Sequence, residues 1–152
     1  MKTRDILLGA GGLLVAVGIG AFIARRNRKT IPEGAEAVKN FDAEKFMGKW
    51  YEVARFDFFW EKNLSSTTAD YSLNSDGTVM VVNCGYDTKK KKWHSAVGKA
   101  WFVGSSTVGM LEVSFFGPFY SGYNVVAVDD SYKHALVFGR NTSYMWLLSR
   151  DR

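Results

Sequence analysis

The chain has 152 residues, of which 20 are Lys or Arg and 15 are Asp or Glu, so its formal net charge is +5. Residues 1–39 hold seven basic and three acidic side chains, which leaves the remaining body nearly neutral. A neutral body argues against nucleic acid as a partner, because phosphate binding requires a basic face. The single cysteine, Cys84, excludes an internal disulfide framework and a CxxC metal site.

The N-terminal segment carries an uncharged, apolar run at residues 6–24, flanked by basic residues on both sides. Its length matches the roughly 30 Å of a bilayer core, so residues 1–29 are predicted to form a hydrophobic helical anchor; a cleaved signal peptide is the alternative. The basic residues that follow the run favour a cytoplasmic side for the rest of the chain. Residues 30–40 are polar, contain Pro32 and Gly34, and predict a linker.

The body is predicted to be all-β. Residues 41–48 suit a short helical turn with Asp42 as its N-cap and Phe46 facing the body. Runs of alternating apolar and polar residues, separated by short turn-forming segments, then predict eight antiparallel strands. Eight such strands leave exposed edges unless they close, so we expect an up-and-down barrel, either filled or holding one small ligand. The predicted strands are 49–56, 67–73, 79–86, 92–103, 109–115, 122–128, 134–139 and 144–149.

Strand parity assigns each connection to one end of this barrel. Odd strands run from the first end to the second, and even strands return. Trp50, the turn at residues 129–133 and Arg150 therefore share the first end. The loop after the first strand, the lysines at residues 89–92 and the loop at residues 116–120 share the second end.

Several motifs in the body resemble one family. The segments GKWYEVARF, SFFGPFYSGYNVVAVD, YKHALVFG and YMWLLSR are similar to the bacterial lipocalins, a group related to apolipoprotein D and the plant temperature-induced lipocalins. The resemblance covers residues 41–152 and implies an eight-stranded barrel that binds fatty acids or lysophospholipids. It also implies a closed end at which the arginine packs over the tryptophan. The residues that match the family's structural motifs are Gly48, Trp50, Asp129, Tyr132 and Arg150.

Two features depart from the family pattern. Bacterial members are usually outer-membrane lipoproteins anchored through an N-terminal lipidated cysteine, whereas no cysteine precedes Cys84. This favours the hydrophobic segment as the anchor. Members also continue into a helix that packs on the barrel wall, and this chain stops at Arg152, so that helix is expected to be absent. The flank would then be open or covered by another chain, which makes a homo-oligomer one of the partners considered.

The predicted ligand site follows from strand alternation. If Trp50 points inward, the residues on its face form an apolar, aromatic lining with a few polar atoms, which suits an acyl chain. Aromatic residues at the second end would line the mouth or pack among the loops. The predicted lining is Ala54, Phe56, Ala69, Tyr71, Asn83, Val113, Tyr123, Tyr144 and Trp146, and the predicted mouth is Phe58, Phe59, Trp60, Phe119 and Tyr120.

The resulting hypothesis is a non-enzymatic lipid carrier of the bacterial cell envelope, tethered in the inner membrane or facing the periplasm. Its expected role is lipid storage, transport or maintenance, with neither cofactor nor metal. His94 and His134 have no carboxylate or cysteine at ligand spacing. Two alternatives remain open. One is a calycin-type enzyme that acts on a lipid or pigment through Glu52 or Cys84, and the other is a filled barrel that serves as an interaction domain.

Overall fold

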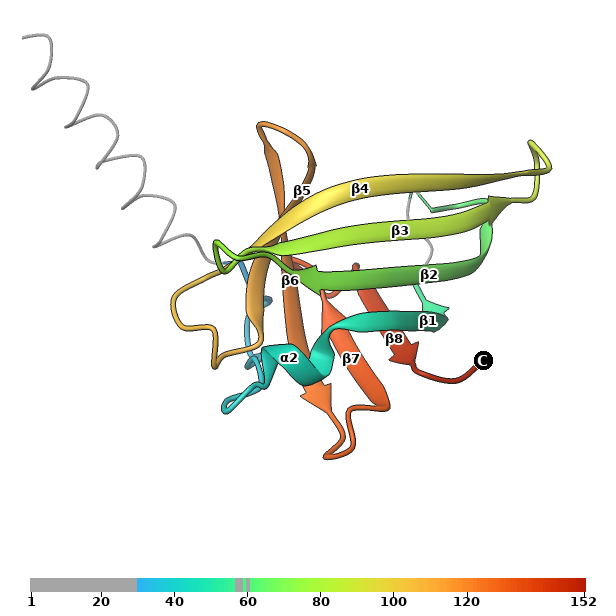
Figure 1. The fold of residues 1–152 in the computed structure, drawn as a ribbon. Coiled ribbons are helices and arrows are strands. Elements are labelled where there is room, and N and C mark those ends of the chain that lie inside the picture. Colours follow the sequence, from blue (N-terminus) through green and yellow to red (C-terminus); the bar gives the residue numbers. More distant parts are fainter. Residues whose placement is uncertain (1–29, 57–58, 60) are drawn as a thin grey trace, which may run out of the picture.

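In the computed structural model, which describes residues 30–56, 59 and 61–152, eight antiparallel strands close into one barrel (Figure 1). Each strand pairs with its successor, and β8 returns to β1, so the chain is an up-and-down barrel as predicted. The strands are β1 (Gly48–Arg55), β2 (Leu64–Leu73), β3 (Val79–Asp87), β4 (Lys92–Phe102), β5 (Met110–Phe116), β6 (Phe119–Val128), β7 (His134–Phe138) and β8 (Met145–Ser149).

Two strands are longer than the sequence predicts. β2 begins at Leu64 instead of residue 67, and β6 begins at Phe119 instead of residue 122. In the β5–β6 hairpin, Phe116 pairs with Phe119, so Gly117 and Pro118 alone make the connection. The sequence predicts this connection in the right place, but the turn of two residues is shorter than the expected loop at residues 116–120.

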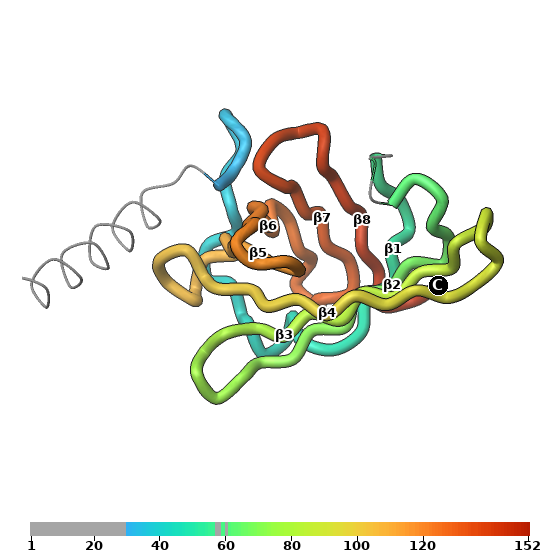
Figure 2. The backbone as a smooth tube through the Cα atoms, turned by 90° about the horizontal axis from the view of Figure 1, so that it is seen from above, coloured from blue at the N-terminus to red at the C-terminus, as the bar shows by residue number. Residues whose placement is uncertain are grey.

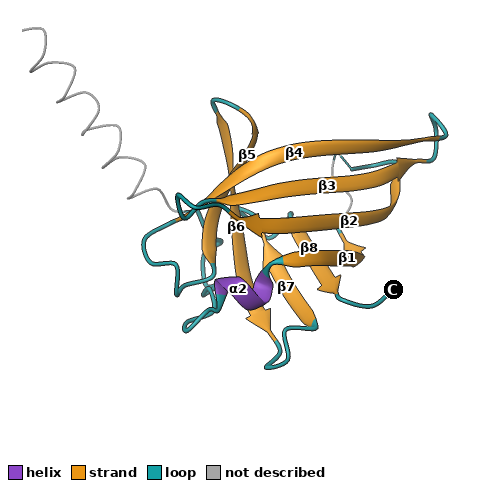
Figure 3. Cartoon of the chain, in the orientation of Figure 1, coloured by secondary structure: helices purple, strands orange, loops and turns teal. Residues whose placement is uncertain are grey.

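The helical turn before the barrel is α2 (Ala43–Phe46), which is the one helix within the part of the chain that the structure describes (Figure 3). The Asp42 carboxylate accepts a hydrogen bond from the Lys45 backbone N–H at 3.1 Å, which caps the first turn as predicted. Phe46 is buried, and its ring lies 4.9 Å from that of Trp50. Phe46 of this turn therefore packs over the end of the barrel at which β1 begins.

Residues 30–41 lie along the outside of the barrel and are hydrogen-bonded to it. The backbone N–H of Val38 donates to the Val125 carbonyl at 2.9 Å, and the Asn124 side-chain amide donates to the Thr30 carbonyl at 2.7 Å. A Cβ at Gly122 would stand 2.0 Å from that carbonyl, so only glycine lets the arm approach the wall this closely. The predicted linker at residues 30–40 is thus packed on the barrel as an arm.

The predicted anchor at residues 1–29 lies outside the described residues. Within the part that the structure does describe, no helix is long and apolar enough to cross a membrane.

Four β-bulges interrupt the regular alternation of the barrel strands. The first lies in β1, where the register with β8 shifts between Glu52 and Ala54. Arg55 rather than Ala54 then pairs with the inward-facing Trp146, and Val53 and Phe56 are about half exposed. The other register shifts lie between Ser65 and Thr68, between Val113 and Phe116, and between Val125 and Ala127.

Candidate ligand-binding interior

One end of the barrel is closed by Trp50, Arg150 and the helical turn. Trp50 is fully buried, and its indole N–H donates to the Phe46 carbonyl at 2.8 Å. The Arg150 guanidinium carbon lies 3.9 Å from the centre of the Trp50 ring, which is a cation–π contact. Its N–H groups donate to the carbonyls of Lys49, Lys45 and Met47 at 2.7–2.8 Å. The arginine therefore ties β8 to β1 and to the helical turn.

Gly48 fits this clamp for two reasons. Its φ of +88° is a conformation that L side chains rarely adopt, and a Cβ there would lie 3.4 Å from Arg150 Nη1.

The β6–β7 turn completes the closed end. The Asp129 carboxylate accepts hydrogen bonds from the Ser131 hydroxyl and from the backbone N–H groups of Ser131, Lys133 and His134. These bonds lower the pKa of Asp129 to about 2. The Tyr132 hydroxyl accepts from the Asp42 backbone N–H at 2.8 Å, which joins this turn to the start of α2.

Inward-facing side chains become less buried from the closed end to the open end. Near the closed end Trp50 and Val125 have no exposed surface, and Val79 has 1%. Towards the open end, inward-facing residues of the paired strands β3 and β4 are less buried. Asn83 is only partly buried, and Ala96, which pairs with it, is exposed. Ala96 shares its strand face with the buried Gly98 and Ala100, because the β3–β4 register is unbroken. The open half of the interior is therefore accessible from outside.

The structure brings most of the predicted lining residues together. One hydrogen bond of 2.7 Å joins the hydroxyls of Tyr71 and Tyr123. The Tyr123 ring also stacks on Trp146, with the ring centroids 6.5 Å apart. Ala69 pairs with Asn83, and Val113 packs against the core. Tyr144 is partly buried and lies just before β8.

Ala54 and Phe56 do not belong to this set. Both are exposed, because the bulge after Glu52 shifts the strand face by one residue. Arg55 takes the inward place that strict alternation had given to its neighbours. The expectation that Ala54 and Phe56 face the interior is corrected by this bulge.

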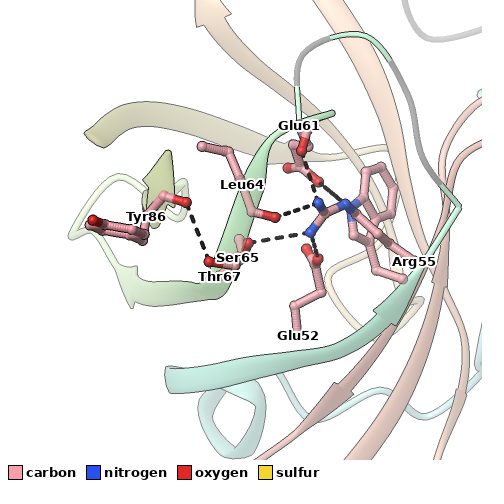
Figure 4. Close-up of polar contacts among 8 residues, drawn as sticks. Glu52, Arg55, Glu61, Leu64, Ser65, Thr67 and Tyr86 are labelled. Carbon is pink, nitrogen blue, oxygen red and sulfur yellow. Dashed lines mark hydrogen bonds and ion pairs between the residues drawn. The ribbon is translucent and has the colours of Figure 1, made fainter. Parts of the chain in front are cut away.

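A charged cluster that alternation did not predict lies just inside the open end (Figure 4). The Arg55 guanidinium donates to the Glu52 carboxylate and, through Nη2, to the carbonyls of Glu61 and Leu64 at 2.8 and 2.7 Å. It also lies 3.7 Å from the Glu61 carboxylate. The side chains of Arg55, Glu52 and Glu61 are 14%, 7% and 14% exposed. Arg55 thus fastens the β1–β2 connection to the barrel interior.

Burial shifts the titration of both carboxyls in this cluster. Burial and, to a smaller extent, the neighbouring Glu52 charge raise the pKa of Glu61 to about 7, although the Trp146 N–H and Arg55 oppose this shift. The Trp146 indole N–H donates to the Glu61 carboxylate at 3.2 Å. Burial also raises the pKa of Glu52, although its ion pair with Arg55 opposes that shift.

The mouth residues have different positions. Phe59 and Phe119 are 81% and 76% exposed. Tyr120 instead packs on the outer wall, with its ring edge-on to Trp101 at 5.7 Å. Phe58 and Trp60 lie outside the described residues.

Two hollows on the outer surface are separate from the barrel interior. One, of about 460 Å³, is lined by residues of β3 to β6, among them Met80, Val97 and Trp101. The other, of about 610 Å³, lies beside α2 at the closed end. Across residues 30–56, 59 and 61–152, no group of three or more His, Cys, Asp or Glu side chains is placed to hold a metal ion.

Comparison with known proteins agrees with this geometry. The family description "Lipocalin-like domain" matches residues 41–152, which is the whole barrel. The chain belongs to the lipocalin family. This lipocalin is 49% identical over 138 residues to the outer membrane lipoprotein Blc of Escherichia coli K12, an alignment that covers 90% of this chain and 78% of the relative.

More distant relatives support the same assignment. Temperature-induced lipocalin-1 of Arabidopsis thaliana is 36% identical over 124 residues, covering 76% of this chain and 66% of the plant protein. Apolipoprotein D of Rattus norvegicus is 28% identical over 120 residues, covering 74% and 62%. Insecticyanin of the tobacco hornworm Manduca sexta shares the fold, with a TM-score of 0.64 at 20% identity over 82% of this chain and 71% of that one. The predicted resemblance is confirmed.

Proposed function

We propose that this lipocalin binds fatty acids or lysophospholipids non-covalently in the open half of its barrel and carries or stores them in the bacterial cell envelope. The observation that supports this most is the gradient of burial along the interior. Inward side chains are tightly packed at the Trp50 end and accessible at the Ala96 end. A barrel with a packed floor and an accessible upper half has room for one ligand that enters from the open end.

The chemistry of the accessible half suits an acyl chain with a polar head. Ala69, Val113, Tyr123 and Trp146 provide apolar and aromatic surface. Burial of the chain contributes roughly 0.8 kcal/mol per CH₂ group, from which the cost of immobilising the ligand is subtracted. The Asn83 side-chain oxygen is buried and has no hydrogen-bond partner within the described chain, so it is the acceptor we assign to a hydroxyl or N–H of the ligand head.

The envelope location rests on the relatives. The Escherichia coli and Vibrio cholerae relatives are named outer membrane lipoproteins and are 49% and 50% identical to this chain. The mode of attachment stays a prediction: residues 1–29 are our candidate anchor.

No catalytic step is proposed. Glu52 lies inside the barrel in an ion pair with Arg55, whereas Cys84 faces the opposite side of β3 from Asn83. The two residues considered for an enzyme are therefore not brought to one site.

A bulky side chain at Ala96 tests the interior as the ligand site. Ala96→Trp would fill the accessible half, and we expect binding of 1-palmitoyl lysophospholipid to weaken about tenfold or more. Val97→Trp is the matched control, because Val97 is the next residue on β4 and faces outward with 62% exposure. Binding is measured by displacement of a fluorescent fatty acid and by native mass spectrometry. Equal affinities for both variants would contradict an interior site, and no saturable binding to the unmodified chain would contradict the proposed function.

A further inference from the structure

Exposed aromatic side chains gather on the connections at the open end. Phe116 and Phe119 are 73% and 76% exposed and form the pair that closes the β5–β6 hairpin. Phe59, on the β1–β2 connection, is 81% exposed. Single exposed apolar residues are ordinary, whereas several exposed phenylalanines at the tips of connections on one end form a larger apolar surface.

The β3–β4 turn adds a tryptophan and a run of lysines. Trp93 is 61% exposed, and one edge of its ring contacts Tyr86 at a centroid distance of 5.5 Å. The lysines at residues 89–92 are all exposed. Asp87 accepts hydrogen bonds from the backbone N–H groups of Lys89 and Lys90, so its carboxylate shapes the turn. The Lys90 ammonium also lies 3.9 Å from this carboxylate. Tryptophan beside lysine is typical of side chains at a membrane–water interface.

The two ends of the barrel differ in charge. Within the described parts of the four open-end connections, the basic residues are Lys62, Lys89, Lys90, Lys91 and Arg140. The acidic residue there is Glu61, whose side chain is turned inward towards Arg55. The closed end has exposed residues of both signs, acidic ones such as Asp76 and Asp130 and basic ones such as Lys45 and Lys133. An anionic surface would thus be attracted more strongly to the open end than to the closed end.

The tips of the open-end connections are spread apart in space. In Figure 1 the β5–β6 tip stands at the top of the view, whereas the β3–β4 turn lies at the far right, where the long strands β3 and β4 end. Seen from above in Figure 2, the β5–β6, β7–β8 and β1–β2 connections surround the barrel opening, and the β3–β4 turn extends beyond it. Aromatic tips with lysines beside them on one side match the chemistry of an anionic bilayer: apolar chains beneath negatively charged headgroups.

We propose that the open end of the barrel docks directly on an anionic lipid bilayer, with Phe59, Phe116 and Phe119 entering the headgroup region and the 89–92 lysines contacting anionic lipids. This inference rests on the proposed lipid-carrying function, since docking would place the accessible half of the interior against the membrane from which a lipid is taken. We call these residues, together with Trp93, the docking rim.

The test measures how deeply the docking rim is immersed, because the N-terminal segment could hold the full chain on vesicles by itself. A nitroxide is attached to Phe119→Cys in a Cys84→Ser background, and the full-length chain is bound to phosphatidylcholine vesicles with or without phosphatidylglycerol. Accessibility of the label to oxygen and to a water-soluble nickel complex reports its depth. Leu73→Cys is the matched control, since Leu73 is an exposed apolar residue at the closed end.

When phosphatidylglycerol is present, we expect the ratio of oxygen accessibility to nickel accessibility at residue 119 to be about tenfold higher than in water. The same ratio at residue 73 should stay at its value in water. Replacing the lysines at residues 89–92 by glutamine should remove the phosphatidylglycerol dependence. Water-like accessibility at residue 119 in both vesicle types, or failure of the chain to associate with either, would overturn the proposal. Spin–spin broadening at residue 119 without vesicles would overturn it too, because a second copy would then cover the docking rim.

Lipid binding is measured on the same labelled protein by native mass spectrometry, which separates the two proposals. A filled interior with a water-exposed docking rim would contradict docking alone. An immersed rim with an interior that never holds lipid would contradict the carrier function alone.

Discussion

At the scale of single residues, Arg55 shows how one side chain can set the geometry of a binding site. Its guanidinium joins Glu52 on its own strand to Glu61 in the next connection and to Leu64 at the start of β2. A buried arginine needs such partners, because an unpaired charge inside a protein is costly. The same contacts hold the β1–β2 connection over the accessible half of the interior. Ionisation of the carboxyls in this cluster therefore affects how the connection is held at the open end.

Glu61 makes this cluster sensitive to pH. Its pKa is about 7 in the folded chain against an ordinary value of 4.5, so the unfolded chain ionises first as the pH rises. The stability that the protonated Glu61 contributes is complete below about pH 4.5 and is lost as the pH rises through 7, by up to about 3 kcal/mol. Glu61→Gln should remove this slope and be more stable than the parent at pH 8.

Urea unfolding at several pH values measures the effect of Glu61→Gln. Glu36→Gln is the control, because Glu36 is exposed and its nearest ionic partner, Lys39, lies at 3.6 Å on the surface. A parent chain whose stability does not fall between pH 5 and pH 8 relative to Glu61→Gln would contradict the assignment.

At the scale of elements, the closed end depends on the contact between the last strand and the first. Arg150 follows β8 and donates to the carbonyls of Lys45 in α2, Lys49 in β1 and Met47 between them. No other described side chain hydrogen-bonds to all three of those carbonyls. The Arg150 side chain, rather than strand pairing, therefore holds the helical turn against the barrel.

Removal of this clamp should destabilise the fold. Arg150→Ala leaves the three carbonyls without their side-chain donor and loses the contact with the Trp50 ring, so we expect a loss of about 2–4 kcal/mol. Arg150→Lys keeps the charge but lacks the planar fork, so it should recover only part of that loss. Thermal and urea unfolding measure both variants, and Arg152→Ala is the exposed control. An Arg150→Ala chain as stable as Arg152→Ala would show that the clamp contributes nothing.

The elements also show why the sequence predicts the fold better than the site. Alternation and turn residues are repeated in every strand, so an error of three residues at the start of β2 or β6 does not change the barrel. Which residues face the interior depends on strict alternation along each strand, and one bulge reverses that alternation for the rest of the strand. Nothing in the composition around Val53 marks the bulge. The spacing of Glu52 and Arg55 is the one available signal, since opposite charges three residues apart share a face only if such a bulge intervenes.

At the scale of the whole molecule, the nearly neutral body conceals a separation of charge and of packing along one axis. The closed end combines a fully buried Trp50 with exposed residues of both signs, and the open end combines accessible inward positions with lysines and phenylalanines. A nearly neutral net charge argues against nucleic acid as a partner but does not reveal this axis, because it is a sum over the whole body. Only the arrangement of the turns in space separates the two ends.

This separation predicts where a bound lipid will change the dynamics of the barrel. Amides at the packed end, around Trp50 and Val125, should exchange slowly whether or not ligand is present, because opening them requires the barrel to unfold globally. Amides near Arg55 and in the β3–β4 hairpin should become slower when 1-palmitoyl lysophospholipid binds, since the ligand packs against the accessible half. Hydrogen–deuterium exchange followed by mass spectrometry resolves the two ends, and Ala96→Trp should show no ligand-dependent slowing. Uniform slowing across both ends would mean that the ligand acts on global stability alone, whereas slowing confined to the packed end would place the ligand away from the open half.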